Sequence, residues 1–370
     1  MTRFRIPARR RTAAAGSAAI RPAARSLLAV ALLALVGGIA ACSSGAATIP
    51  PDATGSAAPP ATATPGPSAT PPPAFPVVLT DDEDNEVSLD AEPQRIVSLT
   101  PANTEILFAI GAGDRVVAPT DVDDDPPEAV DLPDVASFTA VDVEKIVGLD
   151  ADLVVAGGNY FNDPAALDQL RGLGVPVLVV YAATVDAVLD DIRLIGLAAG
   201  NGPEAEMLAA VMEADIEAVS AATAGLAPPR TFYEIDAYGE IYGPADRSFL
   251  EEMIVLAGGD PITTGSTTAY NIPLERLVEA DPEVIVLGDA NYGVTPEIVA
   301  ARPGWDGMTA VRDGAVRPVN DTVVTRPGPR LTEGLRALAM AIHPDLVLPA
   351  PAAAIPAPGR SALRAGGSMS

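Results

Sequence analysis

The sequence offers very few side chains for metal or nucleophilic chemistry. His343 is the only histidine and Cys42 the only cysteine among 370 residues. A zinc site needs several histidine, cysteine or carboxylate ligands, and a Ser-His-Asp hydrolase needs a histidine within reach of its nucleophile. His343 lies directly before Pro344, near the end of a predicted helix, where a cation interacts favourably with the last carbonyls. We therefore predict no catalytic residue, no metal site and no cofactor.

Side chains suited to binding are better represented. The planar guanidinium of Arg326 could grip a carboxylate, amide or phosphate group of a ligand, and a surface ion pair is the alternative. The run from Asp121 to Asp125 could favour a cationic group, although acidic loops are usually only solvated. Four aromatic side chains could stack against a ligand or simply pack in a core: Phe138, Tyr238, Tyr242 and Tyr270.

Charge is distributed very unevenly along the chain. Seven of its 23 basic residues and none of its 49 acidic residues precede Cys42, so the remainder carries 16 basic residues against 49 acidic ones. A body this acidic is unsuited to binding nucleic acid through phosphate contacts. It suits a protein that meets a basic partner or a cationic ligand group.

The first 41 residues have the features of an export signal. An arginine-rich start is followed by an apolar run, Leu27 to Val36, and then by small residues. The run is shorter than the roughly 20 apolar residues that a transmembrane helix needs. Ile39-Ala40-Ala41-Cys42 resembles a bacterial lipobox, in which cleavage precedes a cysteine that carries lipid. We predict a signal peptide over residues 1–41 and lipidation of Cys42; an incidental cysteine or an uncleaved anchor are the alternatives.

Low-complexity segments flank the part that can fold. Residues 42–74 are rich in proline, alanine, serine, threonine and glycine, with too few large apolar residues to pack a core. Their prolines favour an extended, semi-rigid tether. Residues 349–370 have a similar composition and are predicted to form a disordered tail.

The elements that would position the candidate side chains follow one pattern twice. Short apolar strands alternate with helices over residues 75–202 and again over residues 224–348, which favours mainly parallel sheets. Between them, residues 203–223 read as one long helix whose apolar positions share a face: Leu208, Met212, Ile216 and Val219. The sequence predicts an α/β fold with two Rossmann-like lobes bridged by this helix. A surface helix in a single α/β domain is the alternative.

An internal repeat supports two lobes. Val143–Val155 aligns without gaps on Leu274–Val286, and both segments read as a helix, a short loop and a buried strand. Glu144 and Glu275 occupy equal places in the two copies, and each is followed by a basic residue. The apolar pattern alone would fit any helix–loop–strand unit, but the shared Glu-basic pair is less readily explained in that way.

With these residues the chain resembles the substrate-binding proteins of bacterial ABC importers for cobalamin, ferric siderophores and haem, nearest the cobalamin-binding branch. The likeness runs from about Arg95 to Ile342. The segments that carry it are Arg95–Glu105, Asp125–Ala129, Ser137–Glu144 and Arg326–Arg330, together with Glu275.

The resemblance implies a function and site residues. It implies a monomeric, lipid-anchored extracytoplasmic protein, not an enzyme, that captures an iron chelate or cobalamin-type ligand and delivers it to a permease and its ATPase. Glu144 and Glu275 would each pair with permease arginines, which is electrostatically plausible for a rigid body. The resemblance also implies which residues line the ligand cleft. These are Pro101, Ala102 and Asn103 of the opening loop, the aromatic residue Phe138, and Arg326, which lies in a segment that enters the cleft.

The ligand stays open between a corrinoid and an iron chelate. The cobalamin branch tends to have a tyrosine in the turn before the Pro126-Pro127 pair, where this chain has Asp123-Asp124-Asp125. It also tends to have a tryptophan before the second docking glutamate, where this chain has Ala269-Tyr270-Asn271. An exported two-lobe enzyme and a surface sensor module on the same scaffold are alternative functions.

Overall fold

A computed structural model describes residues 75–137, 140–158 and 161–352. The predicted signal peptide, Cys42, the tether and most of the predicted tail lie outside these residues. The described residues belong to one compact unit, Pro65–Ser370. Within them, no helix combines the length and apolar character needed to cross a membrane.

The first lobe is built on a four-stranded parallel sheet with the order β4-β3-β7-β8. Its strands are β3 (Ile96–Ser98), β4 (Val116–Ala118), β7 (Leu153–Ala156) and β8 (Val177–Val179). The helices of this lobe are α1 (Pro101–Ala109), α2 (Pro127–Val130), α3 (Val143–Gly148), α4 (Pro164–Gly172) and α5 (Val185–Ala199). A small hairpin precedes the sheet, with β1 (Val77–Thr80) antiparallel to β2 (Glu86–Leu89).

The second lobe repeats this plan with the strand order β10-β9-β11-β12, again all parallel. Its strands are β9 (Arg230–Glu234), β10 (Asp260–Pro261), β11 (Val284–Leu287) and β12 (Val316–Pro318). The helices are α7 (Phe249–Leu256), α8 (Leu274–Ala280), α9 (Pro296–Ala300), α10 (Thr309–Arg312), α11 (Asp321–Thr325) and α12 (Leu331–Ile342). The predicted fold class, two α/β lobes with mainly parallel sheets, is confirmed.

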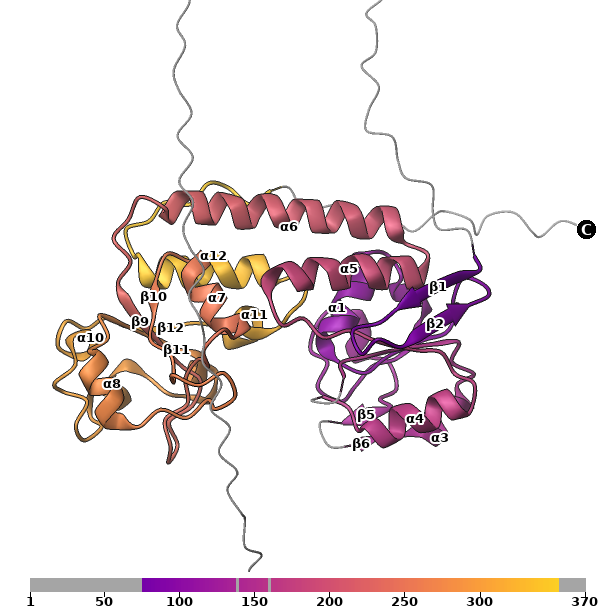
Figure 1. Cartoon of the computed structure of the whole chain (residues 1–370), viewed down its shortest axis with the longest axis horizontal. Helices are drawn as coiled ribbons and strands as arrows, with labels where there is room; N and C mark the ends of the chain where they lie inside the picture. Colours follow the sequence, from indigo (N-terminus) through magenta and orange to yellow (C-terminus); the bar gives the residue numbers. More distant parts are fainter. Residues whose placement is uncertain (1–74, 138–139, 159–160, 353–370) are drawn as a thin grey trace, which may run out of the picture. The chain divides into compact units, whose positions relative to one another are not determined.

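One helix, α6 (Gly202–Thr223), joins the two lobes and packs on both α5 and α12 (Figure 1). Of its predicted apolar stripe, Met212 and Val219 are fully buried, whereas Leu208 and Ile216 are only partly buried. The most buried face includes small residues as well, because α5 approaches closely: a Cβ on Gly196 would lie 2.2 Å from the Cβ of Ala205.

Each sheet is covered on both faces by apolar cores. Successive residues alternate between the two faces, as a pleated strand requires: Ile96 packs in the core beneath α5 and α6, and Val97 packs against α3 and α4. In the second lobe Tyr233 and Phe232 alternate in the same way. The core that contains Ile96 and Tyr233 is continuous through both lobes and includes α6 residues. This shared core ties the lobes together through their helix layer.

The internal repeat is also a repeat of hydrogen bonds. Asp152 accepts from the backbone N–H of Arg95 at 2.8 Å, and Glu283 accepts from that of Arg230 at 3.0 Å. In each copy the same pair is joined by a second bond, from the acidic residue's own N–H to the arginine carbonyl, at 3.0 and 2.8 Å. In each copy the loop contains an aspartate with a left-handed backbone conformation at the same aligned position, Asp150 (φ 50°) and Asp281 (φ 46°). The two segments are therefore equivalent in detail.

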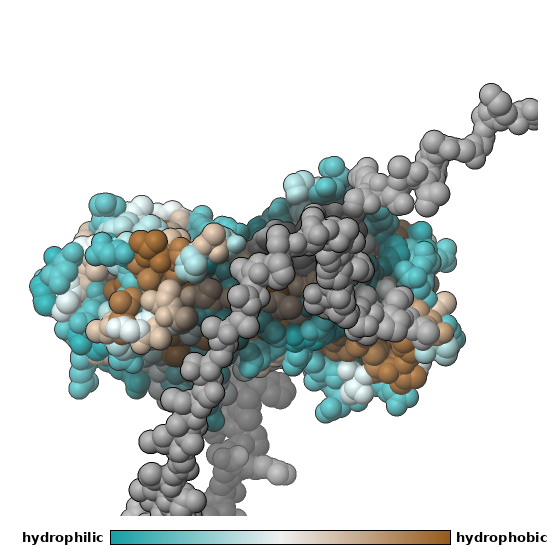
Figure 2. All heavy atoms as spheres, turned by 90° about the horizontal axis from the view of Figure 1, so that it is seen from above, coloured by the Kyte–Doolittle hydropathy of each residue, from teal (hydrophilic) through white to brown (hydrophobic). Residues whose placement is uncertain are grey.

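Several short elements escaped prediction. They include the antiparallel strands β5 (Ala136–Ser137) and β6 (Ala140–Val141), the helices α2, α10 and α11, and the 3₁₀ turns η1 (Gly113–Arg115) and η2 (Gly288–Tyr292). None spans more than five residues, so none contains enough helical turns or strand alternation to produce a periodic signal. Figure 2 shows hydrophilic residues over much of the visible described surface, with separate hydrophobic patches.

A buried acid in α5 makes stability dependent on pH. Burial, and then the nearby carboxylate of Asp82, raise the pKa of Asp191 from 3.8 to about 8. Between these two pKa values the native state keeps the proton on Asp191, whereas the unfolded chain loses it. The free energy of unfolding therefore falls as pH rises through this range, by up to about 1.4 kcal/mol per pH unit. We expect Asp191→Asn to flatten this slope in urea unfolding at pH 5, 6, 7 and 8. The exposed Glu217→Gln is the control; equal slopes in the two variants would contradict the prediction.

Candidate functional site

Ligands of parallel α/β sheets bind outside the carboxyl ends of the strands. In the first lobe the loop after β3 opens α1, whose cap is Thr100. Pro101 is partly exposed there, but Ala102 and Asn103 are buried, the latter 3% exposed. Asn103 Nδ2 has no hydrogen-bond partner in the described part of the chain. Of these three predicted ligand-binding residues, only Pro101 thus has an appreciably exposed side chain.

The predicted tyrosines of the second lobe come together on loops beyond its strands. Tyr238 and Tyr242 follow β9, and Gly243, the next residue, donates its N–H to the carbonyl of Tyr270 at 2.8 Å. Tyr238 is 95% exposed, Tyr270 is 47% exposed and Tyr242 is partly exposed. The Glu240 carboxylate beside Tyr242 raises the pKa of the phenol. Phe138 lies outside the described residues.

Sequence reasoning missed three further exposed aromatic side chains. Phe161 follows β7 and Tyr181 follows β8, and their ring centroids are 6.4 Å apart. Tyr292 ends η2, directly after β11, and is 86% exposed. With Tyr238 and Tyr270, these are the exposed aromatic residues of the described ranges, and all five lie on segments that follow strands. Their positions after apolar strands could have been recognised in the sequence as a sign of exposed aromatic residues at the strand ends.

Arg326 and Arg330 meet acidic residues of the first lobe. Arg326 Nη1 lies 2.6 Å from Glu105 Oε1 and 2.6 Å from Asp124 Oδ1. Arg330 donates to the same Glu105 carboxylate, through Nη2 at 2.6 Å and Nε at 3.1 Å. Arg330 Nε also lies 3.7 Å from Asp125 Oδ2. We call these five residues the interlobe clamp.

The centre of the clamp, formed by Glu105 and the two arginines, is largely removed from water. Glu105 has a side chain only 2% exposed, and the two arginines are 18% and 28% exposed. Burial alone would lower the pKa of Arg326, but its hydrogen bonds to Asp124 and Glu105 outweigh burial and raise it. Both arginines therefore stay charged. The ion-pair alternative for Arg326 is what the structure displays, while its role in ligand binding stays a prediction.

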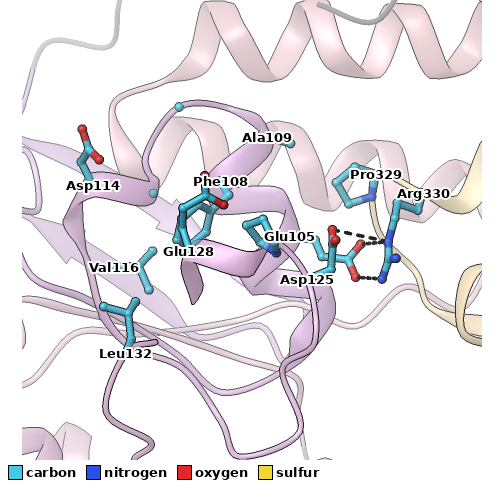
Figure 3. A pocket seen from close by; sticks show the side chains of 13 residues that line it. Glu105, Phe108, Ala109, Asp114, Val116, Asp125, Glu128, Leu132, Pro329 and Arg330 are labelled. Atoms are coloured by element: carbon cyan, nitrogen blue, oxygen red, sulfur yellow. Dashed lines mark hydrogen bonds and ion pairs between the residues drawn. The ribbon is translucent and has the colours of Figure 1, made fainter. Parts of the chain in front are cut away.

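A cavity of about 610 Å³ adjoins the clamp (Figure 3). Its apolar lining includes Phe108 of α1, Val116 of β4 and Leu132, and its polar lining includes Glu105 and Arg330. Gly111, Gly113 and Asp114, which follow the C-terminal end of α1, also line it. The cavity therefore runs along α1, and none of the five exposed aromatic residues lines it.

A second buried ion pair lies at the strand ends of the second lobe. Glu234, the last residue of β9, is fully buried and receives both ends of the Arg302 guanidinium, at 2.6 and 2.8 Å. The guanidinium also lies over the ring of Trp305, 4.6 Å from its centroid. Asp289 follows β11; burial, and then Glu234, raise its pKa to about 7. Nothing in the sequence pattern indicated this arrangement.

The two predicted docking glutamates occupy equivalent sites. Glu144 lies in the first turn of α3 and Glu275 in the first turn of α8, and both are exposed. Neither forms an ion pair or side-chain hydrogen bond with any residue of the described ranges. His343 ends α12 and its Nε2 lies 3.0 Å from the carbonyl of Gly258. The described residues contain no group of three or more potential metal ligands.

Comparison with known proteins finds binding proteins both among family models and among individual relatives. A family model described as periplasmic binding protein matches residues 96–321. An uncharacterized ABC transporter substrate-binding lipoprotein, YvrC of Bacillus subtilis, is 34% identical over 276 residues, covering 73% of this chain and 87% of its own. A cobalamin-binding protein of Halobacterium salinarum is 30% identical over 287 residues, covering 73% and 75%.

Solved structures share the fold. The vitamin B12-binding protein BtuF of Vibrio cholerae is 27% identical with a TM-score of 0.60, covering 68% of this chain and 97% of its own. The haem-binding protein RhuT of Roseiflexus sp. RS-1, in apo form, is also 27% identical with a TM-score of 0.60, covering 68% and 98%. Proteins similar to this chain thus include binders of two different metal chelates.

Proposed function

We propose, from the premise that this chain belongs to the periplasmic binding protein family, that it is the solute-binding protein of an ABC importer. It would capture a cobalamin-type ligand or an iron chelate outside the membrane and pass it to a permease driven by an ATPase. Cys42 would carry the lipid anchor, as the name of the similar YvrC lipoprotein suggests. It would act as a monomer and catalyse no reaction.

The proposed organisation assigns each part a task. Residues 1–41 would direct export, and residues 42–74 would hold the folded body away from the membrane. Residues 75–202 and 224–348 would form the two lobes, with residues 203–223 between them and residues 349–370 as a tail. The described helix α6 has bounds one residue wider at its start, Gly202–Thr223.

The observation that carries the ligand proposal is the placement of the exposed aromatic residues. All five lie after strands of the two parallel sheets, where this fold class binds ligands. Flat apolar rings can cover a corrin or porphyrin face or the apolar parts of a siderophore. Arg326, which follows the last strand of the second sheet, β12, adds a charged group. Its Nε and Nη2 have no partner among the described residues. These donors could take a ligand carboxylate, amide or phosphate oxygen.

Native mass spectrometry of the purified protein tests this function. We would mix it separately with cobalamin, cobinamide, haem and a panel of ferric siderophores. A one-to-one complex with one of these classes is expected and would identify the ligand. If no member of the panel binds at micromolar concentration, the proposed ligand class is wrong.

Truncation of the first-lobe aromatic pair should weaken binding. We expect Phe161→Ala and Tyr181→Ala each to raise the Kd of the identified chelate about tenfold, because an aromatic contact adds roughly 0.5–1.5 kcal/mol beyond its buried area. Isothermal titration calorimetry would measure this. Met207→Ala, on the exposed surface of α6, is the matched control. Unchanged affinity in both aromatic variants would place the ligand elsewhere.

Permease docking is proposed for Glu144 and Glu275. This proposal is supported by the equivalent positions of the two glutamates in α3 and α8 and by the exposure of both side chains. In Figure 1, α3 and α8 both lie on the side of the sheets remote from α6. Two carboxylates on separate lobes of one body would define the orientation of the docked protein, and their charge would speed the encounter.

A further inference from the structure

The clamp joins segments that are distant in the sequence. Glu105 lies 221 and 225 residues from its two arginine partners, and Asp124 lies 202 residues from Arg326. Glu105 belongs to α1, which follows β3, and Asp124 lies in the loop that follows β4. Arg326 and Arg330 lie between α11 and α12, beyond β12. The clamp is therefore a contact between the strand-end sides of the two lobes.

The arginine segment also packs on α1 through its backbone. A Cβ placed on Gly328 would lie 3.5 Å from the carbonyl oxygen of Ala102 and 3.6 Å from Glu105 Oε2. Within the turn, the N–H of Gly328 donates to the carbonyl of Arg326, and that of Leu331 donates to the carbonyl of Gly328. The turn is thus compact, and its two arginine side chains converge on one carboxylate.

We infer that Glu105 is a positioning residue: it holds the two lobes in one mutual orientation and orients the Arg326 guanidinium for the ligand. The second half of this inference rests on the proposed function; the first does not. Glu105 is the only member of the clamp that bonds to both arginines at 3.1 Å or less. Arg326 bonds to Glu105 and Asp124 through Nη1 alone. Its other two nitrogens have no partner in the described ranges, and neither is buried.

A neutral isostere isolates the role of the charge. Glu105→Gln keeps the size of the side chain but removes the charge that both arginines share. The lobes would then be joined by the apolar core and by the weaker pairing with Asp124, which is 57% exposed. We expect a broader range of lobe orientations and a less well-placed Arg326.

Spin-label distance measurement on the protein without ligand tests the first half. Labels would be attached to Gln169→Cys in α4 and Glu279→Cys in α8, both exposed, in a chain with Cys42→Ser. Glu105→Gln should broaden the distance distribution relative to the same chain with Glu105. Glu128→Gln is the matched control, because it is the same change at an exposed carboxylate that lines the cavity beside the clamp and has no partner among the described residues. A distribution as narrow as that of the control would overturn the inference.

Ligand affinity tests the second half. In protein shown by circular dichroism to be folded, Glu105→Gln should raise the Kd of the chelate identified above about tenfold or more. The reason is that a misplaced Arg326 guanidinium loses its hydrogen bond to a ligand oxygen, and a hydrogen bond to a charged group is worth about tenfold or more in affinity. Affinity equal to that of Glu128→Gln would overturn the positioning role. If Glu105→Gln does not fold, Arg330→Gln serves instead, since it leaves the Glu105–Arg326 pair intact and should broaden the distances to a smaller extent. Failure of every chelate to bind would remove the proposed function but leave the distance test valid.

Discussion

Reversing the charge of both docking glutamates, Glu144→Arg with Glu275→Arg, is expected to abolish import while leaving ligand affinity unchanged. Each side chain is exposed in the first turn of its helix and has no charged partner in the described residues. Reversal would therefore cost the folded protein little. It would, however, place like charges against the basic permease groups that we propose, and such a contact costs several kcal/mol.

Uptake of radiolabelled or fluorescent ligand by cells that carry only the variant measures this effect. Each single reversal should reduce uptake by an intermediate amount, because one carboxylate would still engage. Glu217→Arg is the matched control for added positive charge, because Glu217 is an exposed residue of α6 without an ion-pair partner in the part of the chain that the structure describes. Normal uptake by the double variant would show that docking uses other residues, and a parallel fall in affinity would show that the variant had changed the cleft.

The fold was predictable because its information is local and repeated. Alternation of apolar strands with helices, and the aligned segments at Val143 and Leu274, specify two parallel α/β lobes from short windows of sequence. The equivalence extends to hydrogen bonds that no pattern revealed, such as those of Asp152 with Arg95, directly before β3, and of Glu283 with Arg230, the first residue of β9. The face of α6 was predicted only in part, since close approach of Gly196 to Ala205 buries small residues as well as large ones.

The candidate site could be predicted only as single residues whose type suits ligand binding, and not as contacts between distant residues. The sequence left Tyr238 and Tyr270 open between stacking on a ligand and packing in a core, and the structure shows both exposed. The partners of Arg326 were not foreseen, because Glu105 is 221 residues away and its burial results from packing of the whole lobe. A glutamate within an α1 segment gives no local sign that two arginines of another lobe will surround it. Long-range ion pairs of this kind require the fold before they can be recognised.

The buried pair in the second lobe supports the largest expected effect on stability. Arg302→Met should destabilise the protein by about 3–5 kcal/mol, because it leaves the fully buried Glu234 carboxylate without its bidentate partner. Chemical unfolding at pH 8 would measure the loss. Arg317→Met is the control, since Arg317 has no carboxylate partner in the described ranges. A loss no larger than that of the control would mean that Glu234 does not depend on Arg302.

The neighbouring Asp289 gives this prediction a pH dependence and a rescue. Its pKa is already raised to about 7 by burial and by Glu234, so without Arg302 two adjacent carboxyl groups would compete for protons. Protonation relieves that repulsion, and the penalty of Arg302→Met should therefore be smaller at pH 5 than at pH 8. Adding Glu234→Gln to Arg302→Met removes the orphaned charge and should recover most of the stability at pH 8. If the double variant is no more stable than Arg302→Met alone, the loss comes from packing against Trp305 rather than from the unpaired carboxylate.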